Sequence, residues 1–312
     1  MSNQGIKPRS PNGYLYGLAA AASFVLMVSL VKVCREAEIT TRSIVFYRSF
    51  IVLPCCFLLC RRYSLRVKAK GFLLTRCLFG FTAMATSFAA MRWISVVEIN
   101  LLFNLQPVLV AACAPLILGA LERPTKLTLI ALIAALLGSL IIVTPELLAE
   151  QSDVSNHRWL GLSLGALGAL SGAIAHVALR GLQETPAIVT VTWFQVCVAT
   201  LALIPFDGQE LVHLSFTQSA TFALVGVGFC AFVGQLCLTR AYQLLPAVNA
   251  SALGYSTPVF GIMMDLSIFG AVPAFHTLLG GSLIVASGLW WVQRSRASTE
   301  AKTASLHEPG SS

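Results

Sequence analysis

The sequence predicts an all-α polytopic membrane protein, with ten transmembrane helices arranged as two inverted five-helix repeats. Three observations predict this fold: the composition, a regular series of apolar runs, and a similarity between the two halves of the chain. Of the 312 residues, 56% are hydrophobic and only 11% are charged, whereas soluble domains average roughly 25% charged residues. A chain with so little polar surface is not expected to be a cytosolic enzyme, a disordered protein or a nucleic-acid-binding module.

The apolar runs have the length of membrane-spanning helices. A helix needs about 17–25 mostly apolar residues to cross the hydrocarbon core of a bilayer. Ten such runs follow one another along the chain, at 14–31, 43–60, 71–90, 96–119, 126–144, 160–179, 187–205, 217–239, 248–270 and 274–292. No small-residue cleavage site follows the first run, so we expect it to be a span rather than a signal peptide.

The lysines and arginines orient these spans, because cytoplasmic connections are enriched in both residues. With the N-terminus placed in the cytoplasm, fifteen fall in the tails and inward connections and five in the outward connections. The connection at 61–70, RRYSLRVKAK, contributes most to this bias. We therefore expect a multi-pass protein of the cytoplasmic (inner) membrane, with the tails 1–13 and 293–312 both in the cytoplasm and the second of them disordered.

The two halves of the chain resemble each other at several positions. Gly13 and Gly17 fall opposite Gly161 and Gly165 at a shift of 148 residues, and the pair at 107–108 matches the pair at 258–259 at a shift of 151. The stretch 138–141 matches 281–284 at a shift of 143. We expect one repeat at 14–144, a connecting loop at 145–159 and a second repeat at 160–292. Since each repeat has an odd number of spans, the second enters the membrane from the other side, as in many secondary transporters.

The ordered set of spans resembles the drug/metabolite transporter superfamily and, within it, the EamA-type permeases. The stretches that carry the resemblance are FYRSFIVLP at 46–54, LTRCLFGFTAMATSFAAM at 74–91, VEINLLFNLQPVLVAACAPLILGALERP at 97–124 and TRAYQLLPAVNASALGYSTPVF at 239–260. The resemblance implies a secondary transporter of a small metabolite. It also implies a structural role for Glu122 at a span end, although the matching stretch at 269–273 has no acid.

Two interrupted spans are the expected substrate site. Pro107, in the segment Asn104-Leu105-Gln106-Pro107, and Pro258, in Tyr255-Ser256-Thr257-Pro258, occupy matching places in the two halves. Proline breaks the helical hydrogen-bond ladder, and in a membrane the freed groups must meet protein or cavity water. Matching interruptions are the best sequence indication of a transporter's binding site. A pair of kinks that only shape the bundle is the alternative.

Polar side chains within the spans complete the candidate site, because they are costly at bilayer depth and usually face the bundle interior. The expected substrate-binding residues are Arg48, Asn100, Asn104, Gln106, Trp193, Gln195, Gln235 and Tyr255. The candidates for proton coupling are Glu98, His176 and Asp265, each of which could instead lie at an interface. Arg48 could also extend to the outer interface, and for Arg76 we expect the side chain to reach the inner interface.

No motif indicates catalysis. The stretch 161–165 fits G-x-S-x-G but opens an apolar helix instead of joining a strand to a helix. The sequence contains no P-loop, and its nine cysteines are not spaced for zinc. We therefore expect no cofactor and no metal. The expected partners are a small-molecule solute and the lipid bilayer; nucleic acid is not among them, and an oligomer is possible but not indicated. The alternatives left open are a membrane-embedded enzyme acting on lipid-linked substrates and a non-transporting receptor or scaffold.

Overall fold

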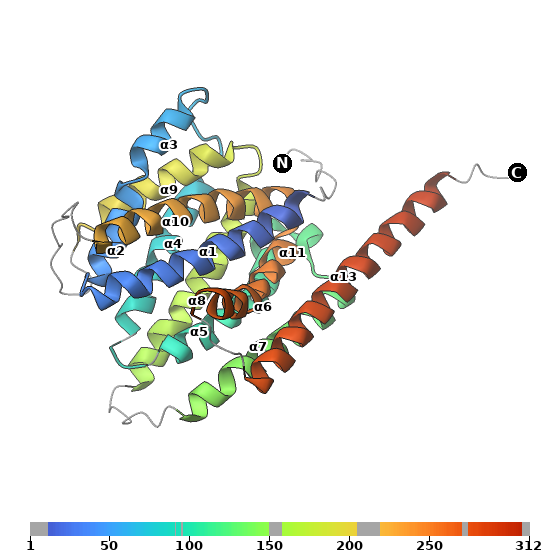
Figure 1. Cartoon of the computed structure of the whole chain (residues 1–312). Coiled ribbons are helices and arrows are strands. Elements are labelled where there is room, and N and C mark those ends of the chain that lie inside the picture. Colours follow the sequence, from blue (N-terminus) through green and yellow to red (C-terminus); the bar gives the residue numbers. More distant parts are fainter. Residues whose placement is uncertain are drawn as a thin grey trace, which may run out of the picture.

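Helices account for nearly all of the backbone that the structure describes. The structure is a computed structural model, and it describes residues 12–90, 92–94, 96–149, 158–204, 219–269 and 274–307. Its long helices, shown in Figure 1, are α1 (Asn12–Glu36), α4 (Lys70–Ala90), α7 (Lys126–Ala149), α8 (Arg158–Gly181), α9 (Ala187–Leu201), α10 (Ser219–Leu244) and α13 (Phe275–His307). No strand occurs in these ranges. The all-helical fold predicted from composition is therefore confirmed.

The remaining expected spans are each divided into shorter pieces. The second consists of α2 (Thr41–Phe50) and α3 (Leu53–Cys60), with Pro54 in the first turn of α3. The fourth consists of α5 (Val96–Asn104) and α6 (Gln106–Leu118), followed by the 3₁₀ turn η1 (Ala120–Glu122). The ninth consists of α11 (Ala247–Ala252), the 3₁₀ turn η2 (Leu253–Ser256) and α12 (Thr257–Phe269). The interruptions of the fourth and ninth spans lie next to Pro107 and Pro258, which the sequence marks as breaks, whereas the break before Pro54 was not predicted.

Five segments of the described chain are long and apolar enough to cross a membrane: Asn12–Val31, Thr41–Cys60, Lys126–Pro145, Arg158–Gly181 and Thr221–Leu244. Two shorter apolar helices are α6 and α9. A helix rises 1.5 Å per residue, so the 15 residues of α9 fall short of the roughly 30 Å hydrocarbon core. The division of spans and this shortness mean that the expected count of ten is not confirmed by helix length.

Helices from the two ends of the chain are interleaved. The most extensive pairings join α1 to α10, α4 to α8 and α7 to α13, and α2 also packs on α9. Figure 1 shows α7 and α13 side by side along one margin of the bundle. They meet at glycines: a Cβ added to Gly138 would lie 2.7 Å from the carbonyl oxygen of Gly280 and 2.9 Å from Ile284. Small residues let helix backbones approach this closely.

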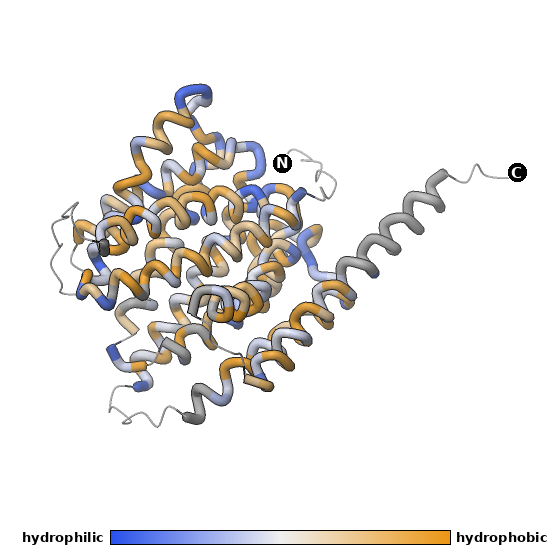
Figure 2. Tube along the Cα trace, viewed as in Figure 1, coloured by the Kyte–Doolittle hydropathy of each residue, from blue (hydrophilic) through white to orange (hydrophobic). Residues whose placement is uncertain are grey.

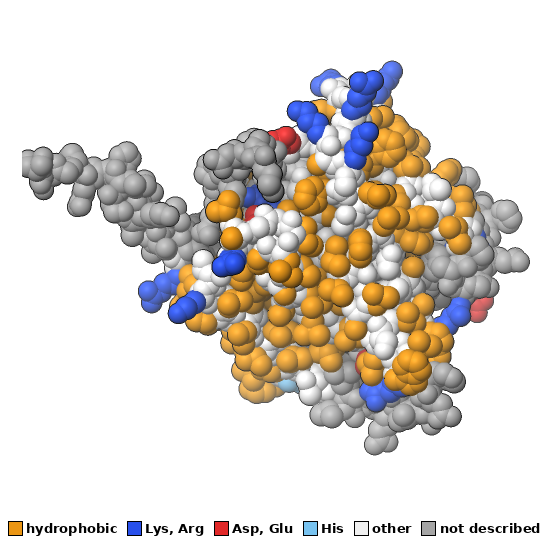
Figure 3. All heavy atoms as spheres, turned by 180° about the vertical axis from the view of Figure 1, so that it is seen from behind, with side chains coloured by type: hydrophobic (Ala, Val, Ile, Leu, Met, Phe, Trp, Pro, Cys, Tyr) orange, Lys and Arg blue, Asp and Glu red, His pale blue; other side chains and the backbone are white. Residues whose placement is uncertain are grey.

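The bundle has two distinct ends. At the first, Gly13 packs on Leu245, Gly181 packs on Phe72, and the indole N–H of Trp193 donates to the carbonyl oxygen of Leu65. The arginines and lysines of the 61–70 connection lie here, so we call it the basic end; Figure 3 shows their side chains gathered at one tip of the molecule.

At the opposite end, Arg42 at the start of α2 donates to the carbonyl oxygens of Ala202 and Leu203 after α9. Between the two ends, hydrophobic side chains cover much of the face seen in Figure 3, and Figure 2 shows that the helices there consist mostly of hydrophobic residues. Large hydrophobic side chains stand exposed on many helices, among them Leu74, Leu116, Phe222, Phe229 and Leu289. An apolar surface of this extent is typical of a protein that faces lipid.

The C-terminal helix differs from the expectation. The sequence predicts disorder after residue 292, but α13 continues to His307. Residues 293–307 contain neither glycine nor proline and include several alanines, arginines and other good helix formers, so propensity favours continuing the helix. The N-terminal tail 1–11 and most of the expected loop at 145–159 lie outside the described residues.

Candidate functional site

The two interrupted segments contact each other inside the bundle. The Tyr255 hydroxyl in η2 donates a 2.9 Å hydrogen bond to the carbonyl oxygen of Asn104, the last residue of α5. Helix α5 ends there, so this carbonyl has no partner in a continuing helix. Tyr255 is buried, with 3% of its surface exposed. Residues that the sequence places in matching positions are therefore joined by a hydrogen bond 151 residues apart along the chain.

A buried arginine lies at the centre of the polar interior. Arg76 is the seventh residue of α4, and only 3% of its surface is exposed. Its Nη2 donates to Oε1 of Gln235 on α10 at 2.6 Å, and its guanidinium covers the Phe194 ring on α9 at 4.0 Å from the ring centroid. The expectation that Arg76 reaches the inner interface is therefore wrong. The side chain instead turns inward, where an amide and an aromatic face replace the water it would otherwise meet.

Arg48 and Gln195 form the neighbouring part of this interior. Ser49 of α2 donates a 2.9 Å hydrogen bond to Oε1 of Gln195 on α9, and both residues are buried. The Nη1 atom of Arg48 lies 4.0 Å from the sulfur of Met27 on α1. The Nε atom of Arg48 and the Nε2 atom of Gln195 are buried with no hydrogen-bond partner. We call Arg48, Arg76, Phe194, Gln195 and Gln235 the central cluster.

Other expected binding residues lie outside the central cluster. Gln106, the first residue of α6, packs against Gly172 of α8, where a Cβ would collide with its side-chain amide. Trp193 is 40% exposed and bonded to the 61–70 connection, so the structure places it at the basic end. The side chains of Asn100 and Asp265 are outside the described part of the structure.

The other two proton-coupling candidates lie at different depths. Glu98 in the first turn of α5 is buried and forms a 2.6 Å ion pair with Arg158 at the start of α8. This pair lies at the opposite end of the bundle, and the Arg158 side chain is 44% exposed. The His176 ring of α8 lies 5.2 Å from the ring of Tyr242 on α10, towards the basic end. Glu98 and His176 are therefore not gathered into one relay.

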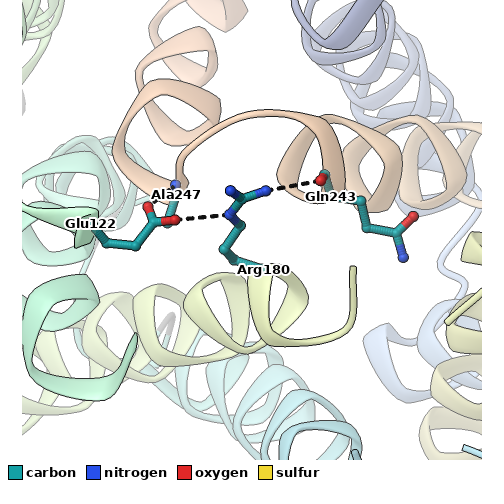
Figure 4. Close-up of polar contacts among 4 residues, drawn as sticks. All are labelled: Glu122, Arg180, Gln243 and Ala247. Atoms are coloured by element: carbon teal, nitrogen blue, oxygen red, sulfur yellow. Dashed lines mark hydrogen bonds and ion pairs between the residues drawn. The ribbon is translucent and has the colours of Figure 1, made fainter. Parts of the chain in front are cut away.

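A second ion pair ties the basic end together (Figure 4). Nε of Arg180, near the end of α8, donates to Oε1 of Glu122 in η1 at 2.8 Å, and both side chains are almost fully buried. The other carboxylate oxygen of Glu122 accepts the backbone N–H of Ala247, the first residue of α11, at 2.8 Å. Nη1 of Arg180 donates to the carbonyl oxygen of Gln243 at 2.9 Å. Four elements of the chain, η1, α8, α10 and α11, therefore meet around one buried charge pair.

Gln243 extends this network to a further turn. Its side-chain amide nitrogen donates to the carbonyl oxygens of Leu182 and Thr185, at 3.0 and 2.8 Å. These two carbonyls belong to the connection between α8 and α9. Further hydrogen bonds to the remaining donors and acceptors help to offset the cost of burying an ion pair, and here the Gln243 carbonyl and the Ala247 N–H supply two of them. We call Glu122, Arg180, Gln243 and Ala247 the basic-end network.

Several of these contacts could not be predicted from the sequence. The resemblance assigns Glu122 a structural role at a span end, and Lys32 falls opposite Arg180 in the repeat, but neither observation identifies Arg180 as its partner. Phe194 falls opposite Phe46 in the repeat, and nothing in the sequence relates it to Arg76. Gln243 carries no signal at all, because its partners are backbone carbonyls that only the folded turn at 182–185 presents.

The described side chains offer no group of three or more His, Cys, Asp or Glu residues that could hold a metal ion. All nine cysteines are free thiols. The polar groups inside the bundle are arginines, amides and hydroxyls, which can bind and orient a solute.

The sequence matches one family of known proteins in both halves. The model of the EamA-like transporter family matches residues 11–144 and again residues 159–292. The chain belongs to the EamA-like transporter family. The two matched ranges confirm the resemblance drawn from the sequence, and they make this chain a membrane transporter built from two copies of the family unit.

Individual relatives agree with the family. The chain is 29% identical over 276 residues to the pseudopaline exporter CntI of Pseudomonas aeruginosa, covering 88% of this chain and 93% of that protein. It is 24% identical over 304 residues to solute carrier family 35 member G1 of Homo sapiens, covering 91% and 81%. A solved crystal structure superposes with a TM-score of 0.76 at 17% identity over 89% of this chain and 95% of the other, which shows a shared fold.

Proposed function

We propose that this EamA-family protein is a secondary-active transporter that moves a small polar or amphipathic metabolite across the cytoplasmic membrane by alternating access. The observation that carries the proposal is the central cluster. Its side chains come from α2, α4, α9 and α10, so both matched ranges contribute. Arginines and other polar side chains inside membrane spans are costly, and they usually mark a binding site for a solute or a water-filled path.

The pairing of helices supports two inverted five-helix repeats. The first helix of each matched range packs on the helix of the third expected span of the other range, as α1 packs on α10 and α8 on α4. The last helices α7 and α13 pack on each other, and Gly138 and Ile142 contact Ile284 and Gly280 reciprocally. Such exchange of partners is expected from a pseudo-two-fold axis. Helix α1 starts at the basic end and α8 at the opposite end, as inversion requires.

The basic-end network suggests how one side is closed. It joins η1 of the first matched range to α8, α10 and α11 of the second. We propose that the basic end faces the cytoplasm, in line with the excess of lysine and arginine there, and that this network breaks when the transporter opens inward. We also propose proton coupling, for which Glu98, His176 and Asp265 are the residues to test.

Flux through the purified protein tests the function. Reconstituted vesicles should exchange a solute from a broad panel of labelled metabolites across the membrane, and empty vesicles should not. A pH gradient should change the rate if protons are coupled. Absence of protein-dependent flux for every class of solute in the panel would contradict the proposal.

A further inference from the structure

Two positive charges in the interior have no carboxylate among the described side chains. The ion pairs in the described structure join Arg158 to Glu98 and Arg180 to Glu122. Arg76 contacts a neutral amide and an aromatic ring instead. Arg48 is the eighth residue of α2, about 10 Å along the helix from its start at the opposite end. An arginine at bilayer depth costs roughly 2.5–3.5 kcal/mol on insertion scales, so these two charges call for a compensating partner.

The same cluster has more hydrogen-bond donors than acceptors. A guanidinium carries five N–H donors and no acceptor. The side-chain oxygen of Gln235 already accepts a hydrogen bond from Arg76, and that of Gln195 accepts one from Ser49. The Nε of Arg48 and the Nε2 of Gln195 are left buried without a partner. Buried donors are nearly always satisfied in proteins, so the central cluster lacks a hydrogen-bond acceptor. Because two cationic side chains lie there, we expect this acceptor to be an anion.

The geometry places these donors around one region. Adjacent residues of α9 link the two arginines: the Phe194 ring lies under Arg76, and Gln195 is bonded to Ser49, the neighbour of Arg48. Gly80 of α4 lets Phe194 and Arg76 pack directly against the α4 backbone, because an added Cβ would lie only 2.7 Å from the ring and 2.9 Å from Nη1 of Arg76.

We infer that the transported solute is a small organic anion whose oxyanion group, carboxylate or phosphate, binds between Arg48 and Arg76. This inference rests on the proposed transport function and adds the substrate class to it. Guanidinium groups bind carboxylate and phosphate through paired, charge-assisted hydrogen bonds. Gln235 is then the neutral partner that positions Arg76 when no solute is bound, and Gln195 supplies an uncharged donor to the same anion.

Ligand stabilisation of the purified full chain in detergent tests the inference. The panel contains short-chain dicarboxylates, phosphate monoesters, and the neutral amides and methyl esters of the same skeletons. We expect either the carboxylate or the phosphate arm to raise the unfolding temperature in a saturable manner, with the neutral analogues inactive. The arm that responds identifies the oxyanion. A response to neutral or cationic compounds alone would overturn the inference.

Three variants and one control separate binding from structure. Arg48→Gln and Arg76→Gln should each weaken the apparent affinity for the anion by about tenfold or more. Gln235→Glu should weaken it to a similar degree without loss of ligand-free stability, because the new carboxylate pairs with Arg76 and competes with the solute. Arg61→Gln changes an exposed arginine after α3 and should leave the affinity unchanged. Unchanged anion affinity in Gln235→Glu would overturn the inference even if Arg76→Gln fails to fold.

Flux measurements distinguish the two levels of failure. The protein could instead transport neutral or cationic solutes at a rate that neither Gln235→Glu nor competing organic anions change. That result would support the transport function and contradict the anionic substrate class. Absence of protein-dependent flux for all classes would instead contradict the proposed function itself.

Discussion

The ion pair of Glu122 and Arg180 is the residue-scale feature with the largest expected effect on stability. Removing one member of a buried pair leaves the other charge uncompensated, at a cost of about 3–5 kcal/mol. We expect Glu122→Gln to lower the unfolding temperature of the purified protein strongly. Replacing both residues, with Glu122→Gln and Arg180→Met, should recover much of the loss because no unpaired charge remains.

The second ion pair provides the control for this prediction. Arg158 is 44% exposed on the side-chain scale, whereas Arg180 is 4% exposed. The Glu98 side chain is only 10% exposed, but water reaches its partner and screens the pair, so Arg158→Gln should cost less than Glu122→Gln. Equal shifts of the unfolding temperature in Glu122→Gln and Arg158→Gln would contradict the larger stabilising role of the basic-end network.

The hydroxyl of Tyr255 allows a finer test of the interrupted segments. Tyr255→Phe removes the hydrogen bond to the Asn104 carbonyl and keeps the ring. We expect a loss of about 0.5–1.5 kcal/mol in the free energy of unfolding and a lower initial transport rate in vesicles. Tyr63→Phe, at a residue that is 51% exposed, is the matched control and should change neither quantity. Full activity of Tyr255→Phe would show that the contact only shapes the bundle.

At the residue scale, the sequence identifies residues that interrupt helices, but it does not identify which side chains contact each other in the fold. The prolines at 107 and 258 indicate where helices are interrupted, since proline cannot donate the missing hydrogen bond. The inward turn of Arg76 could not be predicted, because its distance from the start of α4 is equally compatible with reaching the interface. Burial of Arg76 depends on α9 and α10, whose Phe194 and Gln235 meet it only after folding.

At the scale of elements, the contact between α7 and α13 depends on glycine. A Cβ at Gly138 would come 2.7 Å from a backbone oxygen of α13, which cannot rotate away. We expect Gly138→Ala to destabilise the protein by about 1–3 kcal/mol, the usual cost of overpacking. Gly288→Ala lies in α13 with nothing within 4 Å of the added Cβ, so it should be neutral or slightly stabilising. Thermal unfolding of the two variants compares them; equal effects would contradict the close contact.

The sequence predicts the positions of the helices better than it predicts where they end. The apolar runs locate the helices well, because lipid requires continuous apolar surface and internally satisfied backbone. They say less about where a helix stops in water. The extension of α13 to His307 follows from helix propensity in a polar segment, which hydropathy does not report. The division of the second span at Ile51–Val52, before Pro54, likewise depends on local backbone geometry rather than composition.

At the scale of the whole molecule, the family unit occurs twice and its helices exchange partners. The matched shifts of 148, 151 and 143 residues indicate the repeat in the sequence, and the reciprocal packing of Gly138 and Ile142 with Ile284 and Gly280 corresponds to a shift of 142. Pairwise contacts between the halves could not be read from the sequence, since the shift alone does not say which helix faces which. The central cluster and the basic-end network both depend on those contacts.

Side-specific labelling of a residue in the interrupted segment tests alternating access for the whole molecule. The half-buried Ser256 lies next to Tyr255 in η2, and Ser256→Cys in a background without the nine native cysteines gives a single thiol of nearly the same size. Vesicles of both orientations would be treated with a membrane-impermeant thiol reagent. We expect labelling from the side of the basic end to be slow, and to increase when Glu122→Gln breaks the network or when a transported solute is added. Labelling from the basic end that responds to neither change would contradict a transporter that opens at that end.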